Sequence, residues 1–164
     1  MNKMRKLLDK ILEVLTCLML AMMVITVCWQ VISRYVLGTP STFTEELLRF
    51  ALVWLSMLGM AYVSGKQQHI SLTLFLDKAS PLLRTLWTLV LQICFGLFAL
   101  YALIIGGLQI SSISMAQYSP ALNISMGHVY YALPLGGILI IIYSVLNIMD
   151  SLRNMKALSG TESA

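Results

Sequence analysis

Residues 14–33 read VLTCLMLAMMVITVCWQVIS, an uncharged run that is long enough to cross a lipid bilayer. A hydrocarbon core of about 30 Å needs about 20 helical residues at 1.5 Å each. Three further apolar runs without charges cover residues 50–65, 85–127 and 129–149. The run 85–127 is too long for one crossing, so we expect its helix to end near residue 110 and a polar connection to follow. The sequence therefore predicts four membrane spans.

The composition agrees with a membrane protein. Of the 164 residues, 59% are hydrophobic and 11% are charged, whereas charged residues make up about 25% of a typical globular domain. We found no internal repeat and no boundary that would divide the chain. The predicted fold is an all-α integral membrane protein with one domain, residues 1–164, and spans at approximately 14–36, 44–65, 82–110 and 128–150.

The positive charges predict the orientation in the membrane. Nine of the eleven lysines and arginines precede span one, separate spans two and three, or follow span four: Lys3, Arg5, Lys6, Lys10, Lys66, Lys78, Arg84, Arg153 and Lys156. Cytoplasmic loops of membrane proteins carry such an excess. We therefore predict that both termini are cytoplasmic. As for any membrane-spanning protein, we also predict membrane lipid as a partner. Since no soluble domain is present to bind nucleic acid, the basic pI of 9.1 reflects topology.

Two short helices are expected at the membrane surface. In residues 7–15 the leucines and the isoleucine recur on one helix face, opposite charged residues, which predicts an amphipathic helix before span one. The apolar run behind it is longer than a cleaved signal peptide uses, so we expect a retained anchor. Residues 65–84, GKQQHISLTLFLDKASPLLR, predict a second interfacial helix between spans two and three, although the alternation in HISLTLF also fits an extended segment.

The stretch TPSTFTEELLRFALVW, residues 39–54, places three charges at the start of span two. Thr42 and Glu45 fit a capping box, in which both side chains bind free amides of the first helical turn. Glu46 adds favourable charge at the positive end of the helix dipole. Arg49 lies four residues after Glu45, the spacing of a helical ion pair. These charges therefore have a structural explanation.

Because these charges lie at the outer end of span two and not at mid-membrane, they do not indicate a transport site. Arg34, at the end of span one, can reach Glu45 or Glu46. We predict a polar clasp between spans one and two, formed by Arg34, Glu45, Glu46 and Arg49. Replacing Glu46 or Arg34 with an apolar residue is expected to impair assembly before it alters substrate choice.

Four aromatic residues are predicted as interfacial anchors: Trp29, Phe43, Trp54 and Trp87, because aromatic side chains are enriched where lipid meets water. In span four, Pro134 lacks an amide for the helix and predicts a kink. Broken helices line some transport sites. A proline near a helix start is more often a tolerated kink, and we predict only a kink here.

The sequence offers no catalytic constellation, so we predict that the protein is not an enzyme and needs no cofactor. The two histidines, His69 and His128, are predicted on opposite sides of the membrane and cannot share a haem or a metal. The span centres hold no Asp, Glu, Lys or Arg, although such groups mark ion and substrate paths. Two alternatives stay open: a stand-alone small carrier or channel, and the membrane anchor of a redox enzyme.

The region around span two resembles the small membrane subunit of tripartite ATP-independent periplasmic (TRAP) transporters. The matching features are Arg34-Tyr35, the motif with Phe43, Glu45 and Glu46, then Arg49, Trp54, Gly59 and His69-Ile70. The stretch YSPALNISMGHVYYALPLGG, residues 118–137, is also similar to that family, as are the chain length and the number of spans. One departure is Phe43, where the family pattern usually has tryptophan, so an indole donor is missing.

The resemblance implies a function that composition does not reveal. In TRAP systems a periplasmic binding protein captures an organic acid, such as sialic acid or a C4-dicarboxylate, and delivers it to two membrane subunits. The large membrane subunit carries the sodium and substrate sites and moves as an elevator. The small subunit is thought to provide a fixed scaffold. The resemblance thus implies a bacterial inner-membrane location and these two protein partners.

Overall fold

The computed structural model describes residues 2–66 and 81–161. Its elements are the helices α1 (Asn2–Tyr35), α2 (Thr42–Lys66), α4 (Pro81–Phe98), η1 (Ala99–Ile105), α5 (Gly106–Ser114), α6 (Met126–Tyr130) and α7 (Ala132–Thr161). Four helical stretches are long and apolar enough to cross a membrane: Arg5–Tyr35, Thr42–Lys66, Leu89–Ser114 and Met126–Ser151. The predicted all-helical fold with four spans is confirmed. The interfacial helix predicted between spans two and three lies outside the described residues, as does His69.

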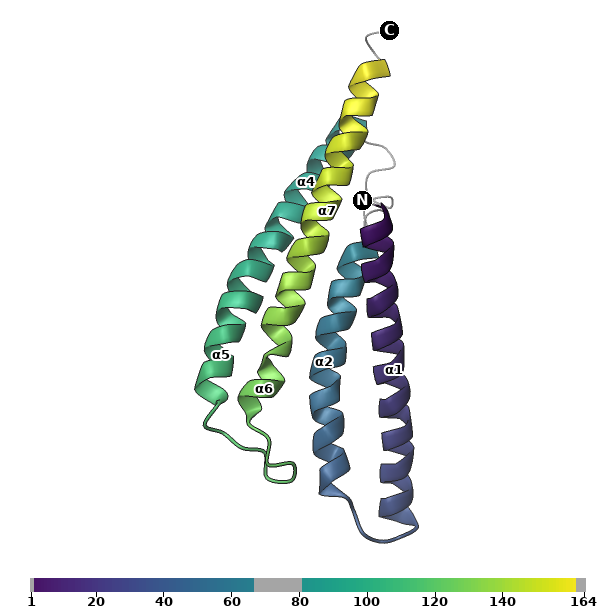
Figure 1. Cartoon of the computed structure of the whole chain (residues 1–164), viewed down its shortest axis with the longest axis vertical. Coiled ribbons are helices and arrows are strands. Elements are labelled where there is room, and N and C mark those ends of the chain that lie inside the picture. The colour runs from purple at the N-terminus through teal and green to yellow at the C-terminus, as the bar shows by residue number, and fades with distance from the viewer. Residues whose placement is uncertain (1, 67–80, 162–164) are drawn as a thin grey trace.

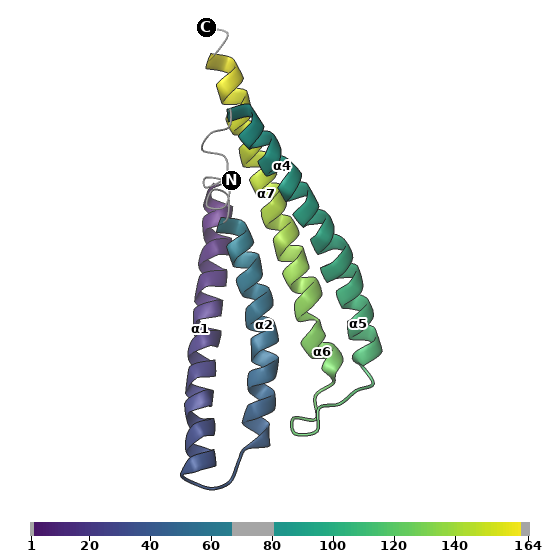
Figure 2. The same cartoon turned by 180° about the vertical axis from the view of Figure 1, so that it is seen from behind.

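The four spans lie side by side in one row (Figures 1 and 2). Helix α1 packs on α2, α2 packs on α7, and α7 packs on α4 and η1, whereas α1 does not approach the third span within the described residues. Helix α7 is therefore central and α1 lies at one edge. Both termini lie at the same end of the row, called here the termini end. The connections 36–41 and 115–125 form the opposite, loop end.

Small residues bring the central helices together. Ala61 of α2, Ala99 and Leu103 of η1, and Ile140 of α7 form one buried cluster. A Cβ atom on Gly137 would lie 2.9 Å from the Leu103 Cβ atom, so α7 and η1 pack too closely for any larger side chain. In lipid, such close packing replaces the hydrophobic effect as the force between helices.

Helix α1 is continuous from Asn2 to Tyr35, so the amphipathic segment predicted before span one is not a separate helix. Leu8 and Leu12 from its predicted apolar face pack against Leu58 and Tyr143. Asp9, which we assigned to the polar face, also turns inward and accepts a hydrogen bond. The reason is that the leucines and the aspartate all find partners on α2 and α7. The pattern of one helix does not reveal such partners.

The third span contains a π-helix, η1, that the sequence did not reveal. At its end the amide of Gly106 donates to the carbonyl of Tyr101, five residues earlier. The helix then continues as α5 to Ser114, beyond the expected end near residue 110. Hydrogen bonds from residue i to i+5 add one residue to a helical turn. They thereby rotate everything that follows relative to a regular α-helix.

Candidate functional site

The carboxylate of Glu46, near the start of α2, binds the loop between α5 and α6. Its Oε2 atom accepts hydrogen bonds from the backbone amides of Ala121 and Leu122, each at 3.1 Å. The hydroxyl of Ser119 donates to the same oxygen. Charge-assisted bonds of this kind are the stronger ones in proteins. Glu46 therefore fastens the tip of this loop to span two.

The loop at residues 115–125 is a tight hairpin with its own hydrogen bonds. The amide of Ser119 donates to the Ile124 carbonyl, and the amide of Asn123 donates to the Ser119 carbonyl, both at 2.9 Å. Asn123 has a φ angle of 53°, in the left-handed region that asparagine tolerates. Tyr118 and Ser125 form an isolated antiparallel bridge at its base. The loop thus presents its amides to Glu46 in a fixed arrangement.

A pocket of ≈ 320 Å³ lies beside this attachment, lined by Thr42, Glu45, Glu46, Arg49, Pro120 and Ala121. One wall comes from the charged first turns of α2 and the other from the loop tip. The pocket therefore brings three of the four predicted clasp residues together with a segment that we had not assigned to the clasp.

The fourth predicted clasp residue, Arg34, is exposed at the end of α1. Within residues 2–66 and 81–161, a salt bridge joins Arg5 to Asp150, and none joins Arg34 or Arg49 to an acidic residue. The connection after α1 is held differently, since the Ser33 hydroxyl donates to the Thr39 carbonyl at 2.5 Å. In this structure Glu46 therefore connects span two to the loop before span four and not to span one.

The N-cap of α2 is Ser41 rather than the predicted Thr42. The Ser41 hydroxyl accepts a long hydrogen bond, 3.5 Å, from the amide of Thr44. The Ser41 carbonyl accepts from the amide of Glu45 at 3.4 Å and from the Thr44 hydroxyl at 2.9 Å. Serine and threonine are both favoured at this position, so residue preference alone could not separate the two neighbours. Thr42 instead begins the helix and lines the pocket.

The predicted aromatic anchors occupy different depths along their helices. Trp29 and Phe43 lie near the loop end, and Trp87 lies near the start of α4; all three are more than half exposed. Trp54 is the central residue of the 25-residue helix α2. It lies about 18 Å from either end at 1.5 Å per residue, which places it at mid-span and not at an interface.

The predicted kink at Pro134 corresponds to a break in the helix. Helix α6 ends at Tyr130, Tyr131 forms a turn, and α7 begins at Ala132. A proline ring collides with the carbonyl four residues before it, here that of Tyr130, and cannot donate to it. The amide of Leu135 nevertheless bonds the Tyr131 carbonyl at 3.2 Å, so the helix recovers within one turn.

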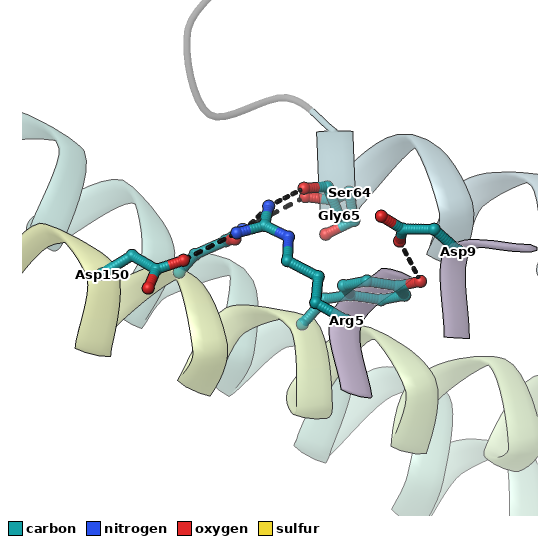
Figure 3. Close-up of polar contacts among 7 residues, drawn as sticks. Arg5, Asp9, Ser64, Gly65 and Asp150 are labelled. Atoms are coloured by element: carbon teal, nitrogen blue, oxygen red, sulfur yellow. Dashed lines mark hydrogen bonds and ion pairs between the residues drawn. The ribbon is translucent and has the colours of Figure 1, made fainter. Parts of the chain in front are cut away.

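A second polar cluster, at the termini end, joins three helices (Figure 3). The Arg5 guanidinium of α1 donates to the Asp150 carboxylate of α7 at 2.7 Å and to the Gly65 carbonyl of α2 at 2.7 Å. It also donates to the side-chain oxygen of Asn147 at 3.1 Å. The Asn147 amide in turn donates to the Ser64 carbonyl at 3.3 Å. Arg5 is therefore the central residue of a network that closes this end of the row.

Tyr143 extends the same cluster. Its hydroxyl donates to the Asp9 carboxylate at 2.6 Å (Figure 3), and its side chain is fully buried. The ring lies against Gly65, where an added Cβ atom would be 2.6 Å from two ring carbons. Gly65 is therefore required by the close approach of the ring.

Sequence reasoning missed this network, although one signal was available. Asn147 stands alone as an amide side chain in the apolar run 129–149, and such residues in membrane helices form hydrogen bonds between helices. Its partners were not predictable because Arg5 and Asp150 lie 145 positions apart and looked like independent surface charges. No group of three or more metal-binding side chains occurs among the described residues.

Comparison with known proteins gives the family. Residues 23–154 match the family model described as the DctQ component of tripartite ATP-independent periplasmic transporters. The chain belongs to this family. It is 26% identical over 163 residues to the sialic acid TRAP transporter small permease protein of Vibrio cholerae, covering 99% of this chain and 94% of that protein.

Two further relatives come from Haemophilus influenzae, and both are described as TRAP transporter small permease proteins. One is 28% identical over 144 residues, 85% of this chain and 86% of the relative. The other is 30% identical over 130 residues, with coverages of 79% and 78%. The chain is thus a multi-pass membrane protein of the small TRAP permease type, as the resemblance around span two implied.

Proposed function

We propose that this chain is the scaffold subunit that supports a large, sodium-coupled elevator subunit in the uptake of an organic acid. A periplasmic binding protein delivers the acid, and sialic acid is one candidate because the Vibrio cholerae relative carries that name. A C4-dicarboxylate is the other. The protein partners are the large membrane subunit and the binding protein, and the site is the bacterial inner membrane.

One observation carries this proposal: the charged groups lie at the two ends of the spans. In the described helices the acidic and basic residues belong to the Arg5 cluster and its neighbours at the termini end, or to the Glu46 region at the loop end. In a chain that carried substrate by itself we would expect a charged group near mid-membrane, because such groups mark ion and substrate paths. The arrangement instead supports a rigid frame fastened at both ends.

We place the termini end in the cytoplasm and the loop end in the periplasm. The excess of lysine and arginine at the termini end supports this orientation. The loop held by Glu46 then faces the binding protein, together with the exposed side chain of Tyr118 and the nearby Tyr130 and Tyr131. Replacing Tyr118 with alanine is expected to weaken binding of the binding protein, and unchanged affinity would refute this docking role.

The experiment that tests the scaffold role is co-purification. The chain, expressed with the large membrane subunit of the same transporter, should be recovered with it as a stable complex in mild detergent. Recovery of the two chains in separate fractions would contradict the proposal. Substrate uptake by this chain reconstituted alone would instead support a stand-alone carrier.

A further inference from the structure

The third span presents a ridge of side chains away from the other helices. Four of its buried positions, Ala99, Leu103, Gly107 and Ser111, recur every four residues on the side that packs against α6 and α7, and Ser114 is buried as well. On the opposite side, Leu97, Tyr101, Ile105, Gln109 and Ile113 recur with the same spacing, and all five are exposed. We call these five residues the outer ridge. The third span, which contains α4 and α5, forms the edge of the row opposite α1 (Figures 1 and 2).

The π-helix aligns this ridge. In a regular α-helix, residues eight positions apart such as Tyr101 and Gln109 point about 80° apart, at 3.6 residues per turn. One additional residue in a turn rotates the following helix back by about 100°. The i to i+5 bond between Gly106 and Tyr101 therefore brings Tyr101 and Gln109 to within about 20° of each other. A straight ridge of this kind packs into the groove of a neighbouring helix.

Tyr101 makes this edge unsuitable for lipid alone. It lies 13 residues, about 20 Å, before the end of the third span at Ser114, and farther from the start of α4 at Pro81. Its side chain is 68% exposed, and no hydrogen bond joins its hydroxyl to another residue that the structure describes. Acyl chains offer no hydrogen-bond partner at this depth. A polar group from another membrane-spanning protein segment would satisfy this hydroxyl.

At the opposite edge of the row, the threonine hydroxyls in α1 already have hydrogen-bond partners. The hydroxyls of Thr16 and Thr26 donate to carbonyls of their own helix at 2.7 and 2.8 Å. Trp29 and Gln30 lie within two turns of the helix end at Tyr35, where headgroups and water can accept hydrogen bonds. The middle of α1 thus suits lipid.

We propose that the outer ridge is the surface on which a transmembrane helix of the large membrane subunit docks, with a polar group opposite the Tyr101 hydroxyl. This inference rests on the proposed function. Ala102, which is exposed, and Gly106, which is half-buried, lie beside the ridge on the same span. Their small size allows the backbone of the partner helix to approach closely.

The test is a competition for the large membrane subunit. Wild-type chain and Tyr101→Phe, each with a different tag, are co-expressed with the large subunit, and the ratio bound to it is measured. Hydrogen bonds between membrane helices predict a deficit of roughly 3- to 30-fold for the variant. The matched control is Tyr35→Phe, which removes the same hydroxyl from an exposed tyrosine at the end of α1. It should compete as well as wild type.

A second pair of variants tests the outer ridge independently of the Tyr101 hydroxyl. Ile105→Trp enlarges the outer ridge, and Ile25→Trp enlarges the exposed face of α1. The proposal is supported if Ile105→Trp competes poorly for the large subunit while Ile25→Trp competes as well as wild type. Loss of competition by Ile25→Trp alone, or undiminished competition by Tyr101→Phe, overturns it while the scaffold role stands. Absence of wild-type binding to the large subunit overturns both. Self-association of this chain through the outer ridge overturns the docking proposal and leaves the scaffold role standing.

Discussion

Gly65 gives the sharpest test of the packing at the termini end. An alanine here would place its Cβ atom 2.6 Å from two ring carbons of Tyr143. The ring cannot easily withdraw, because it is fully buried and its hydroxyl is bonded to Asp9 at 2.6 Å. Overpacking of this kind costs about 1–3 kcal/mol. We therefore expect Gly65→Ala to separate α7 from α2 and to weaken the Arg5 network.

Gly59 provides the matched control on the same helix. An added Cβ atom there would meet nothing within 4 Å, so Gly59→Ala should show only the gain in helix propensity, about 0.5–1 kcal/mol. Gly65 is the second-last residue of α2, so alanine there gains no more helix propensity than at Gly59. A lower stability of Gly65→Ala beyond that difference of at most about 1 kcal/mol reports the collision with Tyr143.

The measurement is thermal unfolding of both variants in the same detergent. For a chain of this length, 1 kcal/mol corresponds to about 2–4 °C in Tm. Gly65→Ala should therefore unfold about 2–12 °C below Gly59→Ala. Equal melting temperatures for the two variants would refute the packing described here.

Three further substitutions test the polar contacts. Asn147→Ala removes a fully buried side chain that bonds two helices and should cost about 1–3 kcal/mol; a loss below that of Ser144→Ala would contradict its role. Ser144→Ala removes hydrogen bonds to Gln92 at 2.8 and 3.1 Å and should cost about 0.6 kcal/mol in detergent unfolding, the average for such bonds in membrane helices. Glu46→Ala should speed proteolysis of the loop at residues 115–125, whereas Glu45→Ala, the adjacent exposed acid, should not; equal cleavage rates would show that Glu46 does not hold the loop.

The spans were predictable because each one leaves a local signal. About 20 consecutive apolar residues suffice to identify a membrane helix, and the runs starting at residues 14, 50, 85 and 129 all became helices. An irregularity near Pro134 could be expected for the same reason, since proline acts on its own helix, although we predicted a kink and not the turn at Tyr131.

The contacts between spans were less predictable. Glu46 lies 73 positions from Ser119, and no periodicity in either segment indicates that they meet. Arg34 was the basic residue of span one that we expected to pair with Glu46. A carboxylate can be satisfied equally well by backbone amides, and the loop offers two. The π-helix was also hidden, and it lies where Gly137 of α7 closely approaches η1.

Substrate uptake in reconstituted vesicles tests the scaffold role most directly. Three kinds of vesicle would contain the large membrane subunit alone, this chain alone, or both. Each would have an inward sodium gradient, and the periplasmic binding protein and labelled sialic acid or C4-dicarboxylate would be added outside. We predict uptake only when both membrane subunits are present. Uptake by vesicles that contain this chain without the large subunit would contradict the account.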